Sequence, residues 1–267
     1  MKKGLAILVG IILVTTMFSA VAEGILRVGM ECNYAPFNWT QAEPGEYAVP
    51  IDGGAGYTDG YDVQIARKIA EGLGRDLVVV KTEWDGLPMG VVSGAFDAII
   101  AGMSPTAERK ITLDFSDAYY TSELVAVVKK DGPYANAKTL ADLAGATIAA
   151  QLNTFHFTVL DQIPDTKGTQ AMETFSAMIV ALQSGAIDAY IAERPGAIAD
   201  TMANPDLSYV AFEDGGFVAS EDDVSIAVGL QKGSPLTEEI NRILAEIDED
   251  TRVQMMLDAT DRQPLNE

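Results

Sequence analysis

The stretch Ser93-Gly-Ala-Phe-Asp-Ala-Ile-Ile-Ala101 decides the fold, because it recurs 91 residues later as Ser184-Gly-Ala-Ile-Asp-Ala-Tyr-Ile-Ala192. The two copies match at seven of nine positions. Each follows an apolar helical stretch and carries a Gly where a helix C-terminus favours a left-handed residue. The apolar run after that Gly predicts a buried parallel strand. The chain therefore repeats one helix–turn–strand unit, which predicts two similar lobes.

Strand-like and helical patterns alternate around the first copy. Such an order is typical of an α/β fold, in which helices cover a mostly parallel sheet. The segment 40–58 is rich in Gly and Pro and predicts an extended hairpin or loop. The predicted strands are Ile25–Met30, 77–81 and 96–101, and the predicted helices are 61–73 and 85–92.

The first 22 residues have the pattern of a secretory signal peptide. Lys2 and Lys3 precede the apolar run 5–14, and Ala20-Val21-Ala22 is a small-x-small cleavage pattern, so we expect cleavage before Glu23. A retained membrane anchor is the alternative, although the run is short for a span. No Cys stands at the cleavage site, which argues against a lipid anchor. We therefore expect a periplasmic or otherwise extracytoplasmic protein.

Composition excludes several classes of protein. The 267 residues are 48% apolar and 21% charged, which is too apolar for a disordered chain. Removing residues 1–22 leaves 16 basic and 39 acidic side chains, a formal charge of −23. Such a surface repels nucleic acid and anionic lipid headgroups. We expect no nucleic-acid partner.

The sequence predicts neither a metal site nor a cofactor. A single Cys and a single His exclude disulfide frameworks and cysteine-based metal clusters. Walker, GxSxG, GxGxxG and His-Glu-x-x-His patterns are all missing from the sequence. The single His156, in a Phe-His-Phe stretch of a predicted helix, is interpreted as a half-buried packing residue.

Ligands of open α/β sheets bind beyond the carboxyl ends of the strands, and the first such edge resembles an anion site. Gly102 allows close approach of the backbone, and Ser104 is predicted to cap a helix that has Pro105 in its first turn. Arg109, one turn further on, could bind a carboxylate with both of its terminal nitrogens. The alternative for Arg109 is an ordinary charge on a surface helix.

The second edge carries the opposite charge. Glu193 ends the second repeated strand, where it could bind the ammonium group of a zwitterion. Arg194 could instead neutralise Glu193 in a structural ion pair. The rings of Tyr34 and Trp84 are candidate walls for a ligand, or ordinary core residues.

These stretches together resemble the solute-binding proteins of polar amino acid ABC transporters, which have the two-lobed type II periplasmic binding fold. The motifs Phe96-Asp-Ala-Ile-Ile-Ala-Gly-Met-Ser-Pro-Thr-Ala-Glu-Arg109 and Gln151-Leu-Asn-Thr154 carry much of the resemblance. It covers nearly all of the chain after residue 22. The other matching stretches are 26–37, 60–66, 84–87, 114–120, 187–193 and 227–230.

The resemblance implies how the α-carboxylate of an amino acid would be bound. Arg109 would contact it, assisted by Ser104 and by the backbone near Gly102. Thr154, at the start of a helix in the second lobe, would meet the same carboxylate when the lobes close. The family usually has Gly-Thr-Thr where this chain has Asn153-Thr154-Phe155, so the Thr154 contact departs from the pattern.

The resemblance also implies the remaining contacts. Glu193 stands where the family usually has an Asp for the α-amino group, and it is one methylene longer. Tyr34 and Trp84 match positions whose rings flank the ligand side chain. Glu31 matches an acidic position that reaches the distal cation of basic amino acids. Together with the acidic surface, Glu31 favours lysine, arginine or ornithine as the ligand, and a neutral polar amino acid is the alternative.

Family topology implies the domain boundaries. Lobe 1 is expected at 24–121 and again at 224–267, and lobe 2 at 122–223. The two crossings, near Thr121-Ser122 and Asp223-Val224, would let the lobes close on a ligand. We expect a monomer that delivers its ligand to an ABC transporter permease in the membrane and is not an enzyme.

Two rival functions share this fold. A cyclohexadienyl dehydratase-like enzyme, acting on arogenate or prephenate, would also use an acid and an Arg in the cleft, so Glu193 and Arg109 do not discriminate. A sensory module that reports a ligand to a receptor is the second rival.

Overall fold

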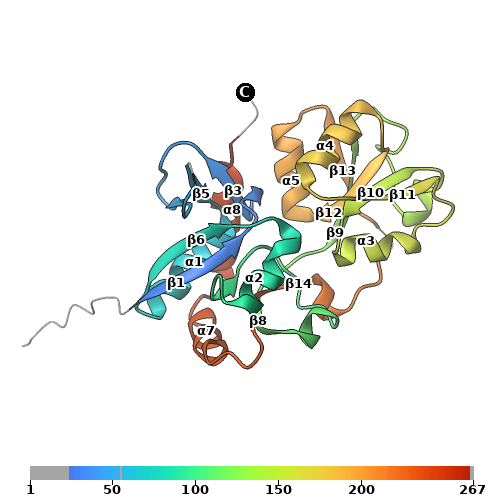
Figure 1. Ribbon diagram of the computed structural model, residues 1–267. Coiled ribbons are helices and arrows are strands. Elements are labelled where there is room, and N and C mark those ends of the chain that lie inside the picture. Colours follow the sequence, from blue (N-terminus) through green and yellow to red (C-terminus); the bar gives the residue numbers. More distant parts are fainter. Residues whose placement is uncertain (1–23, 55, 214, 265–267) are drawn as a thin grey trace, which may run out of the picture.

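The computed structural model describes residues 24–54, 56–213 and 215–264. It is an α/β fold of two lobes, each built on its own five-stranded sheet (Figure 1). The signal-peptide prediction for residues 1–22 lies outside the described residues. Among the described residues, no helix is both long enough and apolar enough to cross a bilayer.

The sheet of lobe 1 has the spatial order β6-β1-β7-β14-β8. Its first three strands are parallel, and β14 runs antiparallel to both of its neighbours. Helices pack on the sheet because their apolar stripes, such as Ile65 and Ile69 of α1, are fully buried. The strands are β1 (Ile25–Met30), β6 (Asp76–Lys81), β7 (Ala98–Ile99), β8 (Leu113–Thr121) and β14 (Ser225–Gln231), and the helices are α1 (Tyr61–Gly72), α2 (Leu87–Ser93), α7 (Leu236–Ala245) and α8 (Glu249–Arg262).

The sheet of lobe 2 repeats this plan in the order β11-β10-β12-β9-β13. Again three strands are parallel, and β9 is antiparallel to β12 and β13. In each sheet four of the five strands therefore run in the same direction and one runs against them, which confirms the expectation of a mostly parallel sheet. The strands are β9 (Leu124–Lys129), β10 (Thr147–Gln151), β11 (Gly168–Met172), β12 (Ala189–Glu193) and β13 (Leu207–Val210), and the helices are α3 (Phe155–Thr158), α4 (Phe175–Ser184) and α5 (Arg194–Ala203).

The repeated nine-residue stretch forms the same structure in both lobes. Helices α2 and α4 end at Gly94 and Gly185, which adopt left-handed φ values of 76° and 79°. Strands β7 and β12 follow, as predicted. The first of these is only the two residues Ala98–Ile99, shorter than the predicted 96–101.

The aspartate of each copy binds the neighbouring parallel strand. Asp97 accepts a hydrogen bond from the backbone N–H of Arg27, and Asp188 accepts one from Thr147, each at 2.8 Å. Both copies of the repeat therefore share a hydrogen bond from the turn to the neighbouring strand, β1 in lobe 1 and β10 in lobe 2.

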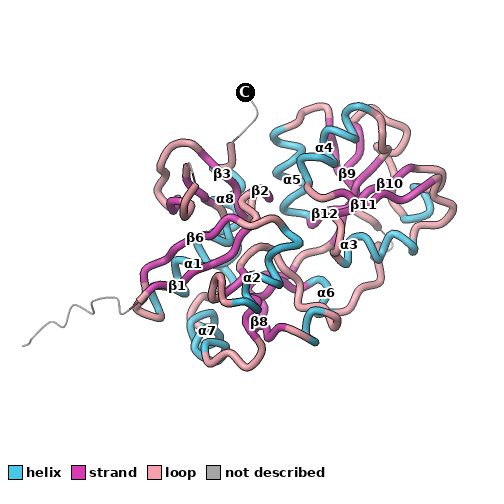
Figure 2. The backbone as a smooth tube through the Cα atoms, viewed as in Figure 1, coloured by secondary structure: helices cyan, strands magenta, loops and turns pink. Residues whose placement is uncertain are grey.

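The chain passes between the sheets at two adjacent points. Strand β8 of lobe 1 leads through Ser122 into β9 of lobe 2, and α6 (Glu221–Val224) leads back into β14 (Figure 2). The backbone N–H of Ser122 donates to the carbonyl of Val224 at 3.0 Å, so the two connections are hydrogen-bonded to each other.

The segment 40–58 contains the predicted hairpin, since β4 and β5 pair antiparallel, and it belongs to a small sheet in the order β2-β3-β5-β4. One local prediction needs correction. No helix begins at Pro105: the backbone from 103 to 106 is neither helical nor strand-like, and a short 3-10 helix starts only at Arg109. The strands of the small sheet are β2 (Asn33–Tyr34), β3 (Asn38–Gln41), β4 (Val49–Pro50) and β5 (Tyr57–Asp59).

Candidate functional site

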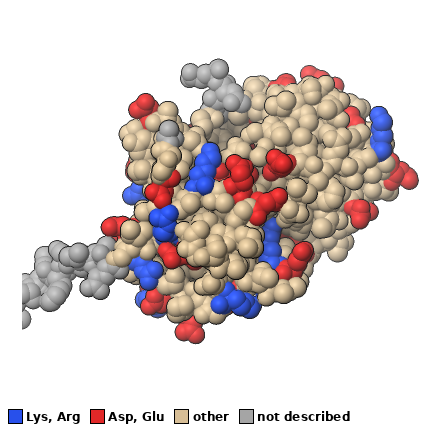
Figure 3. Space-filling model, viewed as in Figure 1, with Lys and Arg blue, Asp and Glu red and all other residues tan. Residues whose placement is uncertain are grey.

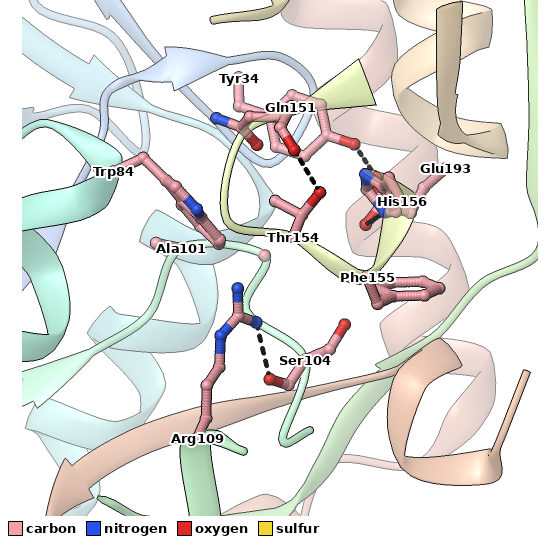
Figure 4. Close-up of a pocket in the computed structure, with 11 residues that line it drawn as sticks. Tyr34, Trp84, Ala101, Ser104, Arg109, Gln151, Thr154, Phe155, His156 and Glu193 are labelled. Atoms are coloured by element: carbon pink, nitrogen blue, oxygen red, sulfur yellow. Dashed lines mark hydrogen bonds and ion pairs between the residues drawn. The ribbon is translucent and has the colours of Figure 1, made fainter. Parts of the chain in front are cut away.

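A cavity lies between the lobes, where the carboxyl ends of β7 and β12 face each other (Figure 4). Seven of the eight predicted site residues line it, and Glu31 is the exception. The lining residues are Tyr34, Trp84, Ala101, Gly102, Ser104 and Arg109 from lobe 1 and Gln151, Thr154, Phe155, His156 and Glu193 from lobe 2.

Arg109 is held in place by both lobes. Its Nη1 donates to the carbonyl of Ser104 at 2.9 Å, and its Nη2 donates across the cleft to the carbonyl of Asn153 at 3.0 Å. The guanidinium also lies over the ring of Trp84, 5.1 Å from its centroid. Burial lowers the pKa of Arg109 to about 10, so it stays protonated at neutral pH. The surface-charge interpretation of Arg109 is wrong.

The turn 152–154 explains the departure from Gly-Thr-Thr. Asn153 has a left-handed φ of 57°, a conformation that Gly adopts freely and that Asn tolerates better than most residues. Its side chain donates to Asp85 of lobe 1 at 2.9 Å. Thr154 caps the start of α3 and donates its hydroxyl to the carbonyl of Gln151 at 2.7 Å. Asn153 therefore keeps the backbone turn and adds a contact between the lobes.

Glu193, the last residue of β12, is the acidic counterpart of Arg109. Its carboxylate is buried; Oε2 accepts from the hydroxyl of Tyr34, and Oε1 lies 3.0 Å from Nε2 of His156. Burial alone would raise the pKa of Glu193, but His156 and the hydrogen bonds outweigh it and the net pKa is lowered. Glu193 is therefore ionised at neutral pH.

Arg194 does not neutralise Glu193, contrary to the alternative prediction. It begins α5, and Pro195 follows it in the first turn of the helix. Its side chain forms an ion pair with Glu123, at the connection between β8 and β9. The first residue of the helix therefore points its charge away from the cavity.

Tyr34 forms the wall between the cavity and the apolar core. Its ring stacks on Phe37 with centroids 5.0 Å apart and, across the lobes, on Phe175 at 4.2 Å. A Cβ at Gly196 of α5 would lie 3.0 Å from the Tyr34 ring. The close fit of lobe 2 around this ring accounts for a glycine in the first turn of α5.

Glu31 is buried at the end of β1, one shell behind the cavity. The amide of Gln151 lies between Glu31 and the cavity. Its Nε2 is 3.4 Å from both carboxylate oxygens of Glu31 and donates to the carbonyl of Glu173 at 3.2 Å. Burial raises the pKa of Glu31 to about 7, and the nearby carboxylates Glu83 and Asp85 add to the rise. Acidic side chains also gather on the surface where the lobes meet (Figure 3).

Sequence reasoning missed three polar or aromatic lining residues, Gln151, Phe155 and His156. The prediction that His156 is half-buried is wrong, since it is 4% exposed and contacts Glu193. The Phe-His-Phe stretch predicted only that His156 lies in a helix, and α3 confirms this. The signal that could have found it is its place two residues after the family's Thr154 contact.

The cavity pairs a half-buried cation, Arg109, with a buried anion, Glu193. Within the described residues, no three His, Cys, Asp or Glu side chains come together as a metal site. A guanidinium on one wall and a carboxylate on the other are complementary to a zwitterion, because the guanidinium can bind the carboxylate of the ligand and the carboxylate can bind its ammonium group.

Comparisons with known proteins identify the family and the fold. The model of the bacterial extracellular solute-binding proteins, family 3, matches residues 26–259. The arginine-binding extracellular protein ArtP of Bacillus subtilis is 28% identical over 233 residues, which are 86% of this chain and 84% of that protein. A probable histidine-binding protein of Campylobacter jejuni is 31% identical over 192 residues, or 72% of this chain and 69% of that one.

Solved structures show the same fold. An amino acid ABC transporter substrate-binding protein from Streptococcus pneumoniae, bound to L-arginine, has a TM-score of 0.77 and 28% identity, and the match covers 91% of this chain and 98% of that one. A shorter match, 36% identical over 97 residues, is to a cyclohexadienyl dehydratase of Pseudomonas aeruginosa, and it covers 36% of this chain and 32% of that enzyme.

Proposed function

The chain belongs to the bacterial extracellular solute-binding proteins of family 3, and on this premise we propose that it binds a free amino acid between its lobes. Arg109 contacts the α-carboxylate and Glu193 contacts the α-ammonium. The observation that carries the proposal is that these two oppositely charged groups, one half-buried and one buried, line one cavity from different lobes. Two relatives support it, one named an arginine-binding protein and the other a probable histidine-binding protein.

The carboxylate subsite uses the donors that Arg109 keeps free for a ligand. A guanidinium has five N–H groups, and two of its nitrogens here hold backbone carbonyls of Ser104 and Asn153. Thr154 borders the same space from lobe 2. Since Arg109 already spans the cleft, a carboxylate on it strengthens a contact that exists only when the lobes are closed.

A basic amino acid suits the far end of the cavity. Glu31 lies behind Gln151, and a distal ammonium or guanidinium would be drawn to it once the amide moves aside. Such a cation would favour the ionised form of Glu31. The arginine-bound relative with the same fold supports this choice, and a neutral polar amino acid is the alternative.

Transport follows from closure. The lobes, 24–121 with 224–267 and 122–223, would rotate about the connections at Thr121-Ser122 and Asp223-Val224. Closure around the ligand would present both lobes to an ABC transporter permease on the outer side of the cytoplasmic membrane. The protein would act there as a monomer, exported through a cleaved signal peptide.

The ionised state of Glu193 disfavours the dehydratase alternative. A general acid must hold its proton at the working pH. The lowered pKa of Glu193 leaves that carboxyl without a proton at neutral pH, which suits an ammonium ligand. Glu193 itself is therefore poorly suited to act as the general acid of a dehydratase at neutral pH.

Thermal unfolding of the purified, ligand-stripped protein against the twenty amino acids and ornithine tests the proposal. A ligand at about a thousand times its Kd adds roughly 4 kcal/mol to the free energy of unfolding. For a chain of this size the expected rise in Tm is roughly 8–16 °C.

Three outcomes separate the alternatives. Shifts confined to lysine, arginine and ornithine support a cationic subsite at Glu31, whereas shifts with neutral polar amino acids keep the amino acid proposal and reject that subsite. No shift with any of them, together with turnover of arogenate or prephenate, would replace it with the enzyme.

A further inference from the structure

A second cavity, of about 290 Å³, lies between the lobes and borders the first, the cavity of Arg109 and Glu193. Tyr34 lines both cavities and separates them. Burial raises the pKa of the Tyr34 hydroxyl well above its ordinary value, and Glu193 in the first cavity and Asp200 in the second add to the rise. The residues of the second cavity that matter here are Tyr34, Trp39 and Lys81 from lobe 1 and Phe175, Ile179 and Asp200 from lobe 2.

Asp200 of α5 is the only acidic residue among the described residues that line the second cavity. Its Oδ2 accepts a hydrogen bond from the hydroxyl of Tyr190 at 2.6 Å. Burial raises the pKa of Asp200 to about 7, and the bond from Tyr190 offsets only part of the rise. Within 24–54, 56–213 and 215–264, no Lys, Arg or His side chain forms an ion pair with it. A carboxylate held in this way is costly unless a cation approaches it.

The other walls of the second cavity suit an organic cation. The ring of Tyr34 stacks on that of Phe175 across the lobes, with centroids 4.2 Å apart, and Trp39 adds a buried indole. Hard metal ions require several oxygen ligands, whereas aromatic rings beside one carboxylate favour an organic ammonium or guanidinium. Lys81, the one basic residue among the described lining residues, is exposed and donates to Thr40 at 3.1 Å. Solvent therefore screens its charge.

The internal repeat relates the two cavities to each other. Phe175 stands 91 residues after Trp84, and Asp200 stands 91 residues after Arg109, which is the spacing of the repeated stretch. Trp84 and Arg109 line the first cavity, whereas Phe175 and Asp200 line the second. Each lobe therefore supplies one cavity with an aromatic ring before the repeated strand and a charged residue after it. The charge is positive in the first cavity and negative in the second.

We propose that the second cavity binds a small organic cation, with an ammonium or guanidinium head on Asp200 and an aliphatic stem against the rings of Tyr34 and Trp39. Tyr190 orients the carboxylate through Oδ2, and Oδ1 can accept a hydrogen bond from the ligand. Because residues of both lobes line the cavity, the site is complete only while the lobes are together. The proposal goes beyond amino acid binding, which it places in the first cavity.

Tryptophan fluorescence can report on the two cavities separately. The chain has two tryptophans, of which Trp84 lines the first cavity and Trp39 the second. The variant Trp84→Phe therefore emits from the second cavity alone, and Trp39→Phe from the first alone. The probes are butylammonium and butylguanidinium, titrated at constant ionic strength and about pH 8, where Asp200 is mostly ionised.

We expect at least one probe to change the Trp39 emission of Trp84→Phe in a saturable way. Adding Asp200→Asn should weaken that binding at least about tenfold, because the amide keeps an acceptor for Tyr190 but removes the charge. Asp206→Asn, which removes an exposed carboxylate of the same lobe outside the cavity, is the matched control and should change the affinity by less than about twofold. Uncharged 1-butanol, which has the same stem, should bind at least about tenfold more weakly than the cation.

Three results would overturn the proposal. The first is no saturable change of Trp39 emission with either probe, and the second is equal affinity with and without Asp200→Asn. The third is a change seen only for Trp84 in Trp39→Phe, which would place the cation in the first cavity. Amino acid binding is measured independently, by thermal unfolding and by Trp84 emission, so either proposal can fail without the other.

Discussion

The two lobes share a scaffold and differ in the chemistry that follows it. Both contain the repeated helix–turn–strand unit, with Gly94 and Gly185 ending the helix and with Asp97 and Asp188 bonded to the neighbouring strands β1 and β10. The two lobes differ in the segment that follows the repeated strand. Lobe 1 brings a cation to the cavity and lobe 2 brings an anion.

Backbone conformation at one residue separates the two edges. Gly102 follows β7 with a left-handed φ of 64°, and an irregular loop then carries Arg109 back over the cavity. In lobe 2, Glu193 has an extended φ of −66° and passes directly into α5. The comparison teaches that a duplicated scaffold fixes where a site lies, while the connection after the strand decides which charge reaches it.

Arg109→Ala should cause the largest loss of ligand affinity, because it removes the cation that lobe 1 brings to the cavity. Removing one partner of a buried, hydrogen-bonded charge pair costs about 2–5 kcal/mol, so affinity for every α-amino acid should fall by about a thousandfold. Calorimetry with the ligand found by thermal unfolding measures it. Arg67→Ala, on α1 and bonded to the backbone of 46–47, is the matched control and should bind normally. Normal binding by Arg109→Ala would refute the carboxylate assignment.

Glu193→Gln should come next, with a loss of about a hundredfold at neutral pH. The amide keeps the shape of the side chain but removes the charge that faces the ammonium, worth about 2–3 kcal/mol when buried. Glu123→Gln, whose carboxylate pairs with Arg194 outside the cavity, is the matched control. If the two variants bind equally well, lobe 2 does not supply the anion.

Asp97→Ala and Asp188→Ala test the shared scaffold. Each removes the acceptor of an exposed or half-buried backbone hydrogen bond, so each should lower the free energy of unfolding by about 0.5–1.5 kcal/mol in urea. The corresponding Asn variants keep an oxygen acceptor and should lose less. A large loss in one lobe and none in the other would break the equivalence of the two copies.

Glu31→Gln should have the smallest and most selective effect. The pKa of Glu31 is about 7 in the ligand-free protein, and a distal cation favours its ionised form. Affinity for arginine should therefore rise as pH increases through about 7 and level off above it, by about tenfold overall. Calorimetry of Glu31→Gln should show this rise greatly reduced, and affinity for glutamine nearly unchanged. An equal loss for both ligands would place Glu31 outside the specificity subsite.

Much of the fold could be predicted because its signals are local. The repeat, the glycines after α2 and α4, and the apolar periodicity of α1 are all visible within short windows of sequence. The prediction of a helix at Pro105 was wrong because Ser-Pro after a strand is equally compatible with a loop. The left-handed Gly102 also turns the chain away from a helical path.

The site was less predictable where it depends on contacts between distant segments. His156 and Glu193 are 37 residues apart and meet only because α3 packs beside the end of β12. The screening of Glu31 by Gln151 likewise needs both lobes in place. Adjacency in sequence suggested an ion pair that does not form, since Arg194 follows Glu193 yet pairs with Glu123.

The most direct test of the central claim, that one zwitterion bridges Arg109 and Glu193, compares three forms of a single ligand. The affinities of L-arginine, of its decarboxylated analogue agmatine and of its deaminated analogue 5-guanidinopentanoate are measured by calorimetry on the wild-type protein. The account predicts that each analogue binds at least about a hundredfold more weakly than L-arginine, since each leaves one buried charge unpaired. L-arginine binding no more tightly than either analogue would contradict it.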